Sequence, residues 1–142
     1  MQPPPSDDKG VLPHDHPGIV ADDLVIRRIS EQFIVNDPRS GGRRISSMAY
    51  RESSTGHGGM SVDLERLILE AGIDPRVFAT TPRWIGSVYF EAGQIRSLGC
   101  RIGYDPSPDN PYHGEVWLGA SKASRSLQLA AVWSVPIPEV SP

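Results

Sequence analysis

The sequence predicts an α+β domain, with a small mixed β-sheet, about three helices and flexible, proline-rich termini. Three observations support this fold class: a β-branched run at Leu24–Ile29, apolar residues at helical spacing after Ser61, and turn signals between segments of both kinds. The expected order is strand, strand, helix, strand, helix, strand, strand, helix, which favours a sheet with helices packed on one face.

The 142 residues are enough for one domain with a single core. Residues 1–22 hold five prolines and four acidic residues among few large apolar side chains, and they are predicted to form a disordered N-terminal arm. Residues 23–134 form the single α+β domain. Residues 135–142 have closely spaced prolines that exclude a helix, which predicts a proline-rich C-terminal tail or a docking strand.

The first half of the domain is predicted from alternation and helix signals. Leu24–Ile29 is an expected strand, and the alternation over Arg43–Arg51 predicts a second one. Ser53–Gly59 contains three glycines and small polar residues, so it is expected to be a flexible loop. It leads into a helix with Ser61 as its N-cap and Gly72 as its stop.

The second half is predicted in the same way. Its expected elements, in chain order, are a strand at Trp84–Phe90, a helix at Glu91–Leu98, strands at Cys100–Tyr104 and Gly114–Leu118, and a closing helix from Ser121 to about Ser134.

Charge and composition exclude several classes of protein. A formal net charge of −3 gives no strong nucleic-acid signal. No apolar run reaches the 18 or so residues that cross a bilayer, so no membrane association is expected. The single Cys100 cannot form an internal disulfide, and the chain is expected to be a soluble, cytoplasmic protein.

Two features could bind an anion. The glycine-containing loop before Ser61 would expose backbone N–H groups at a helix N-terminus, unless it is only a mobile loop before a capped helix. The arginine pairs 27–28 and 43–44 could converge on a phosphate or carboxylate, whereas the alternative is that they pair with acidic residues at a sheet edge. No Walker A or complete dinucleotide pattern is present, and no cofactor is predicted.

His113 and Glu115 are the main candidates for acid–base catalysis, together with Asp63. Two residues apart on a strand, His113 and Glu115 would share one face, although a histidine that only satisfies a loop hydrogen bond is the alternative. The stretch 14–16 could chelate a metal but lies in the expected arm. The remaining candidate ligands show no ligand spacing, so no metal is predicted.

Four segments together resemble a family of short, functionally unassigned bacterial proteins. These segments are Val25–Ile29, Ile45–Tyr50, Met60–Asp63 and Asn110–His113. The resemblance spans roughly residues 23–134 and implies a bacterial domain in which Arg27, Ser47, Ser61, Asp63 and His113 belong to one site. The arginine strand followed by a serine-rich strand is also similar to ADP-ribosyltransferase-like toxins, although the chain lacks their S-T-S strand and late catalytic glutamate.

The leading hypothesis is an accessory module that recognises a protein partner or an anionic small ligand. Its expected ligand-binding residues are Arg27, Ser47, His57, Ser61, Asp63 and His113. The competing hypothesis is a small nucleotide-dependent enzyme or toxin in which Arg27 holds a phosphate and His113 serves as acid or base. A third possibility is that these residues only connect loops to the sheet.

Overall fold

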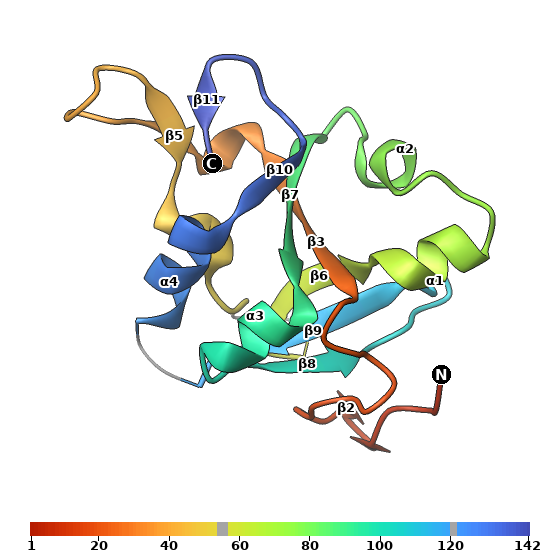
Figure 1. The fold of residues 1–142 in the computed structure, drawn as a ribbon. Helices are drawn as coiled ribbons and strands as arrows, with labels where there is room; N and C mark the ends of the chain where they lie inside the picture. Colours follow the sequence, from red (N-terminus) through yellow and green to blue (C-terminus); the bar gives the residue numbers. More distant parts are fainter. Residues whose placement is uncertain (54–56, 120–121) are drawn as a thin grey trace.

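A computed structural model describes residues 1–53, 57–119 and 122–142 and confirms the α+β class. Its main element is a six-stranded sheet in the order β10-β7-β3-β6-β9-β8, in which every neighbouring pair is antiparallel (Figure 1). The strands are β3 (Leu24–Ser30), β6 (Met60–Leu64), β7 (Trp84–Glu91), β8 (Arg101–Tyr104), β9 (His113–Trp117) and β10 (Val132–Val135).

Helices cover both faces of this sheet, which corrects the expectation of one covered face. Val25 and Ile26 are neighbours on β3, point to opposite faces, and are both fully buried. Val25 belongs to the main core, which includes residues of α3 (Ala92–Ser97) and α4 (Ala123–Ala130). On the other face lie α1 (Glu65–Glu70) and α2 (Pro75–Ala79) (Figure 1).

A second sheet of three short strands packs beside the main one. It contains β4 (Ile34–Asn36), which follows the 3₁₀ turn η1 (Glu31–Phe33), together with β5 (Arg43–Ile45) and β11 (Val140–Ser141). β11 runs parallel to β5, and Ile137 and Val140 are buried against the core. The C-terminal segment is therefore a docking strand rather than a free tail.

Two predicted elements change type in the structure. The second expected strand ends at Ile45 and is followed by the 3₁₀ turn η2 (Ser47–Tyr50), which begins where the Ser46 side chain accepts a hydrogen bond from the Met48 amide at 3.2 Å. The expected helix N-cap, Ser61, lies inside β6, and α1 starts only at Glu65. The stretch Met60–Leu64 alternates between apolar and polar residues, so it fits a strand whose apolar side chains face the core.

Other differences are smaller. The closing helix ends at Ala130, and the chain continues as the edge strand β10. The helix α2 was not predicted, because its proline suggested a loop between two elements. Proline at the first position of a helix is favourable, and the Asp74 side chain caps α2 by accepting from the Arg76 amide at 2.9 Å. The strands expected near residues 84–90, 100–104 and 114–118 and the helix expected near 91–98 are present. The expected cap Ser121 and residues 54–56 of the expected flexible loop lie outside the described residues.

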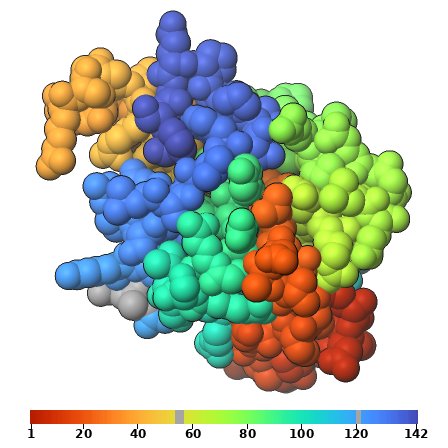
Figure 2. Space-filling view, in the orientation of Figure 1, coloured from red at the N-terminus to blue at the C-terminus, as the bar shows by residue number. Residues whose placement is uncertain are grey.

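Residues 1–22 pack on the domain, which corrects the expectation of a disordered arm (Figure 2). After a small hairpin of β1 (Ser6–Asp7) and β2 (Gly10–Val11), the chain runs along the outer edge of β8. The His16 amide donates to the Ile102 carbonyl at 2.8 Å, and His14 Nε2 accepts from the Tyr104 amide at 3.1 Å. These bonds satisfy an otherwise open sheet edge, a stabilisation that a count of apolar residues does not detect.

The longest described helix, α4, has eight residues, so no helix in the described part of the chain can cross a membrane.

Candidate functional site

The candidate site lies where β3 and β6 separate. These strands pair only through Val25 with Leu64 and Ile26 with Asp63, after which the Arg27 side chain enters the gap. Its Nε donates to the Ala49 carbonyl and its Nη1 to the Ser61 carbonyl, both at 2.9 Å. Arg27 therefore replaces the missing bonds between the strands and brings a positive charge into the fold.

The charge of Arg27 is only weakly compensated. Burial lowers the pKa of Arg27 from its usual value, and the acidic neighbours Glu115 and Asp63 oppose that shift through space. Among the described residues Arg27 makes no ion pair, and its two hydrogen bonds go to neutral carbonyls. A desolvated cation without a counter-ion is costly, and a bound anion would remove that cost.

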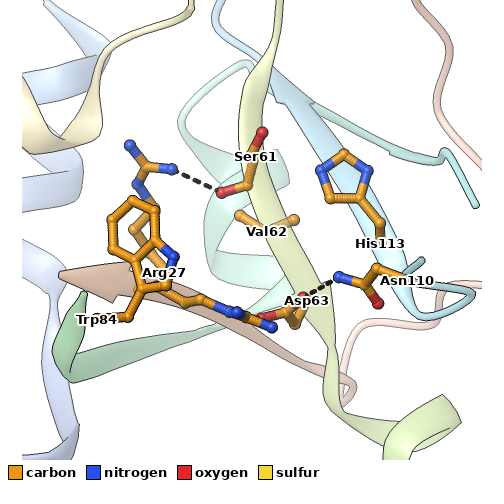
Figure 3. Close-up of a pocket in the computed structure, with 8 residues that line it drawn as sticks. Arg27, Ser61, Val62, Asp63, Trp84, Asn110 and His113 are labelled. Carbon is orange, nitrogen blue, oxygen red and sulfur yellow. Dashed lines mark hydrogen bonds and ion pairs between the residues drawn. The ribbon is translucent and has the colours of Figure 1, made fainter. Parts of the chain in front are cut away.

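Asp63 organises the neighbouring side of the site and is 3% exposed. Its Oδ2 accepts from Arg28 Nε at 2.7 Å and its Oδ1 accepts from Asn110 Nδ2 at 2.8 Å (Figure 3). The Arg28 guanidinium also lies 5.0 Å from the centre of the Phe78 ring. Because both oxygens of Asp63 are engaged, its role in this geometry is to hold Arg28 and Asn110 in place.

Two adjoining hollows surround Arg27. The first has a volume of about 210 Å³ and the second about 470 Å³, and they share Arg27, Ser61 and Trp84. We call the combined depression the Arg27 groove. Its first hollow, drawn in Figure 3, is also lined by Arg28, Val62, Asp63, Asn110 and His113. Its second hollow is also lined by Phe33, Met48, Arg51, Glu52, Ser53, Met60 and Arg83.

The Arg27 groove carries an excess of positive charge. Its lining includes four arginines but only two carboxylates, and one of these carboxylates, Asp63, is already paired with Arg28. In the described ranges neither Arg51 nor Arg83 forms an ion pair. The Arg83 guanidinium lies 4.7 Å from the Trp84 ring centre, so an aromatic surface and a cation sit together at the rim.

His113 contributes an imidazole to the first hollow. It lies opposite Asp63 in the register of β9 and β6, and its Nδ1 is 2.8 Å from the Asp105 carbonyl oxygen. Since a carbonyl can only accept, Nδ1 is the donor in this contact. Nε2 has no hydrogen-bond partner in the described residues, so the neutral ring can accept a proton there.

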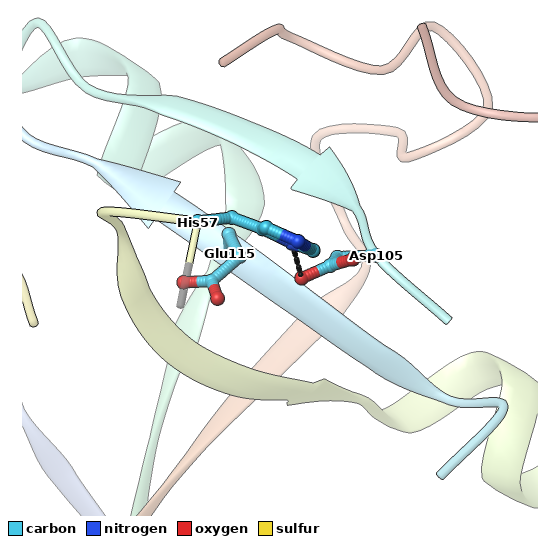
Figure 4. A group of neighbouring side chains, drawn as sticks. All are labelled: His57, Asp105 and Glu115. Atoms are coloured by element: carbon cyan, nitrogen blue, oxygen red, sulfur yellow. Dashed lines mark hydrogen bonds and ion pairs between the residues drawn. The ribbon is translucent and has the colours of Figure 1, made fainter. Parts of the chain in front are cut away.

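A second polar cluster consists of His57, Asp105 and Glu115 (Figure 4). His57 Nδ1 lies 2.7 Å from Asp105 Oδ2. Glu115 is 5% exposed, and its Oε2 has no hydrogen-bond partner in the part of the chain that the structure describes. Burial raises the pKa of Glu115, and Asp105 acts in the same direction, whereas the nearby His113, His57 and Arg27 lower it.

The structure brings together some of the predicted site residues. Arg27, Ser61, Asp63 and His113 line one hollow. Ser47 lies in η2 and His57 belongs to the second cluster, and neither lines the groove. Glu115 is buried beneath the surface. The sequence did not indicate Trp84, which was noted as the start of a predicted strand, or Arg51 and Arg83. Asn110 stood within the Asn-Pro-Tyr-His stretch, and its proximity to His113 was the only available signal.

Tyr50 belongs to the hydrophobic core and interacts through space with Arg27. It is completely buried, its hydroxyl has no hydrogen-bond partner among residues 1–53, 57–119 and 122–142, and burial raises its pKa against the opposing effect of Arg27. Tyr50→Phe removes an unsatisfied polar atom without changing the packing, so the free energy of unfolding should rise by about 1 kcal/mol. Urea unfolding measures this change.

Tyr104→Phe is the control, because the Tyr104 hydroxyl donates a hydrogen bond to the Pro111 carbonyl at 3.3 Å. This bond should stabilise the protein slightly, so its removal in Tyr104→Phe should lower the free energy of unfolding slightly. A loss of stability in Tyr50→Phe equal to or larger than that in the control would show that the Tyr50 hydroxyl is satisfied in solution.

Comparison with protein-family models, curated proteins and solved structures gives no match to this chain. The resemblance to an unassigned bacterial family therefore stays a prediction. The fold and the site define a small α+β domain with an arginine-lined groove. Because a fold of this class does not determine function, the groove is the feature that bears on it.

Proposed function

We propose that this domain binds a small anionic ligand, a phosphate-bearing molecule, in the Arg27 groove. The observation that carries the proposal is the environment of Arg27, a half-buried cation that donates only to neutral carbonyls and has no counter-ion in the described residues. A phosphate could accept from the remaining N–H groups of the guanidinium, in the charge-assisted geometry that arginine favours.

The size and lining of the groove favour a ligand larger than one phosphate. Its two hollows meet at Arg27, and Arg83 and Arg51 lie along the second hollow. Phe33 and Trp84 add aromatic surface, which suits an organic group attached to the phosphate. A nucleotide or another compound with linked phosphates would use both features.

The positions of the two termini favour a small ligand over a protein partner. Flexible ends that extend from a domain could dock on a protein partner. Both ends pack on the domain itself, through the edge of β8 and through β11, so neither is free for that role in this structure. We infer a bacterial, cytoplasmic binding module, with support from the family resemblance and the single cysteine.

A nucleotide-dependent enzyme is the second candidate, and the position of His113 favours it. The ring lines the same hollow as Arg27 and presents an unpartnered Nε2. Arg27 would hold a phosphate while His113 acts as general acid or base. Turnover of NAD or ATP by the parent protein, lost in His113→Ala while nucleotide binding remains, would distinguish this candidate from a binding module.

A thermal-shift screen tests the proposal. Pyrophosphate, ADP, ADP-ribose and NAD at millimolar concentration are compared with chloride at equal ionic strength. At least one compound with linked phosphates should raise the Tm by several degrees, because binding to the native state stabilises it. Arg83→Ala, at the rim of the groove, should lower the affinity for the ligand found in the screen about tenfold, because it removes one charged contact and leaves the core intact.

Arg101→Ala is the matched control. Arg101 is exposed on β8, does not line the groove and makes no ion pair among the described residues. Its loss should leave the shift unchanged. An absence of any shift in the parent protein, or equal losses in the two arginine variants, would count against the groove as the binding site.

A further inference from the structure

The cluster of His57, Asp105 and Glu115 has the composition of a metal site and is separate from the lining of the Arg27 groove. One potential ligand atom from each residue lies within 4.8 Å of the others (Figure 4). His57 precedes β6, Asp105 follows β8 and Glu115 lies in β9, so the fold gathers ligands from three segments. The sequence predicted no metal because His57 and Asp105 are 48 residues apart and form no short ligand motif.

Glu115 is the residue that most needs a partner. The residue is 5% exposed, and its Oε2 is buried without a hydrogen bond to any described residue. In the described residues Glu115 has no ion pair with any lysine or arginine. Native proteins rarely leave such an oxygen unsatisfied, and a bound cation is one of the few ways to satisfy it.

We propose that His57, Asp105 and Glu115 bind a divalent transition-metal ion, with Zn²⁺ as the best candidate. Imidazole and carboxylate ligands at about 2.0–2.2 Å from such an ion lie at most about 4.4 Å from one another, close to the 4.8 Å within which these three atoms lie. His57 Nδ1 and Asp105 Oδ2, 2.7 Å apart, have to separate slightly to admit the ion. Water completes the coordination, as it does at sites with three protein ligands.

The proton balance of binding follows from the contact between His57 and Asp105. Their Nδ1 and Oδ2 atoms, 2.7 Å apart, share one proton. When the metal ion binds Nδ1 and the carboxylate, that proton moves to Nε2 of the ring, so the imidazole stays neutral and this pair releases no proton. His113 remains outside the ligand set and positions Asp105, because its Nδ1 is bonded to the Asp105 carbonyl oxygen.

Two glycines let the chain close over this cluster. A Cβ at Gly59 would stand 2.7 Å from Glu115 Oε2, and a Cβ at Gly10 would collide with His57 Nε2. The backbone therefore approaches two of the ligands from two sides. His14 and His16 are unsuited to binding a metal ion, because both ring nitrogens of each are hydrogen-bonded to backbone groups.

The test is a titration of chelator-treated full-length protein with ZnCl₂ by calorimetry, followed by metal analysis of the desalted protein. One Zn²⁺ per chain is expected, together with a rise in Tm. Glu115→Gln should bind at least 100-fold more weakly while its metal-free form stays folded, because the amide keeps the shape and removes a buried charge. Glu91→Gln, the same charge change at an exposed position, should bind as the parent does.

Co²⁺ provides a second readout that does not depend on stability. Its visible absorption should rise to saturation at one equivalent in the parent protein and in Glu91→Gln, and should be weak in Glu115→Gln and His57→Ala. No saturable binding of Zn²⁺ or Co²⁺ by the parent, or equal binding by Glu115→Gln, would overturn the proposal. Phosphate-ligand binding in the Arg27 groove is measured separately, so either proposal can fail alone.

Discussion

Arg27→Met is expected to lower the affinity for the tightest-binding phosphate ligand about 100-fold, which corresponds to a loss of roughly 2.7 kcal/mol of binding free energy. The variant keeps much of the volume of the side chain but removes the cation at the junction of the two hollows. Truncating one partner of a desolvated charged contact commonly costs 2–5 kcal/mol of binding free energy. Calorimetric titration of both proteins at one salt concentration measures the difference.

The same variant should change the stability of the ligand-free protein by no more than about 1 kcal/mol. Two hydrogen bonds to the Ala49 and Ser61 carbonyls are lost, at about 1 kcal/mol each, but the cost of burying an unpaired charge is lost with them. A large loss of stability without a loss of affinity would identify Arg27 as a structural strand connector and would contradict a binding role.

Asp63→Asn is expected to lower the free energy of unfolding by about 3 kcal/mol. The substitution leaves Arg28 without its counter-ion and turns an amide N–H₂ group toward either Arg28 or Asn110, which are both donors. Breaking a buried ion pair by removing one partner typically costs 3–5 kcal/mol, and the partial exposure of Arg28 places the expected value at the lower end. Urea unfolding monitored by tryptophan fluorescence measures it.

Glu70→Gln is the matched control for Asp63→Asn. Glu70 pairs with Arg66 at 3.2 Å on the exposed surface of α1, where an ion pair contributes little. Its loss should cost less than about 0.5 kcal/mol. If the two variants were equally stable, Asp63 would not organise the side of the groove that contains Arg28 and Asn110.

The fold class and several strands were predictable because their signals are local. The apolar, β-branched and aromatic run that became β7 reads as a strand without any knowledge of its neighbours, and the helix α3 ends before Gly99, which has a positive φ of 83°. Met60–Leu64 was misread because its residues satisfy both a helix start and a strand alternation. Pairing with β3 and β9 selects the strand, and pairing is a tertiary effect.

The N-terminal segment shows a different limit of sequence reasoning. Its composition is typical of a disordered arm, yet Asp15 accepts from the Ile102 amide at 3.1 Å and pairs with Arg96, and Ile19 joins the core. Those partners lie on β8, on α3 and in the core, and no local sequence pattern predicts them. The Arg27 groove is similar, because Arg83 and Trp84 approach Arg27 only through the pairing of β3 with β7.

The binding role of Arg27 is tested most directly by the side-chain Nε–Hε resonances of the arginines during a titration with pyrophosphate, with Arg27→Met used to assign the Arg27 signal. We expect the signals of Arg27 and Arg83 to shift and saturate together while that of Arg101 stays unchanged. Saturable binding that leaves the Arg27 resonance unmoved, or small shifts spread evenly over all arginines, would contradict a ligand site in the Arg27 groove.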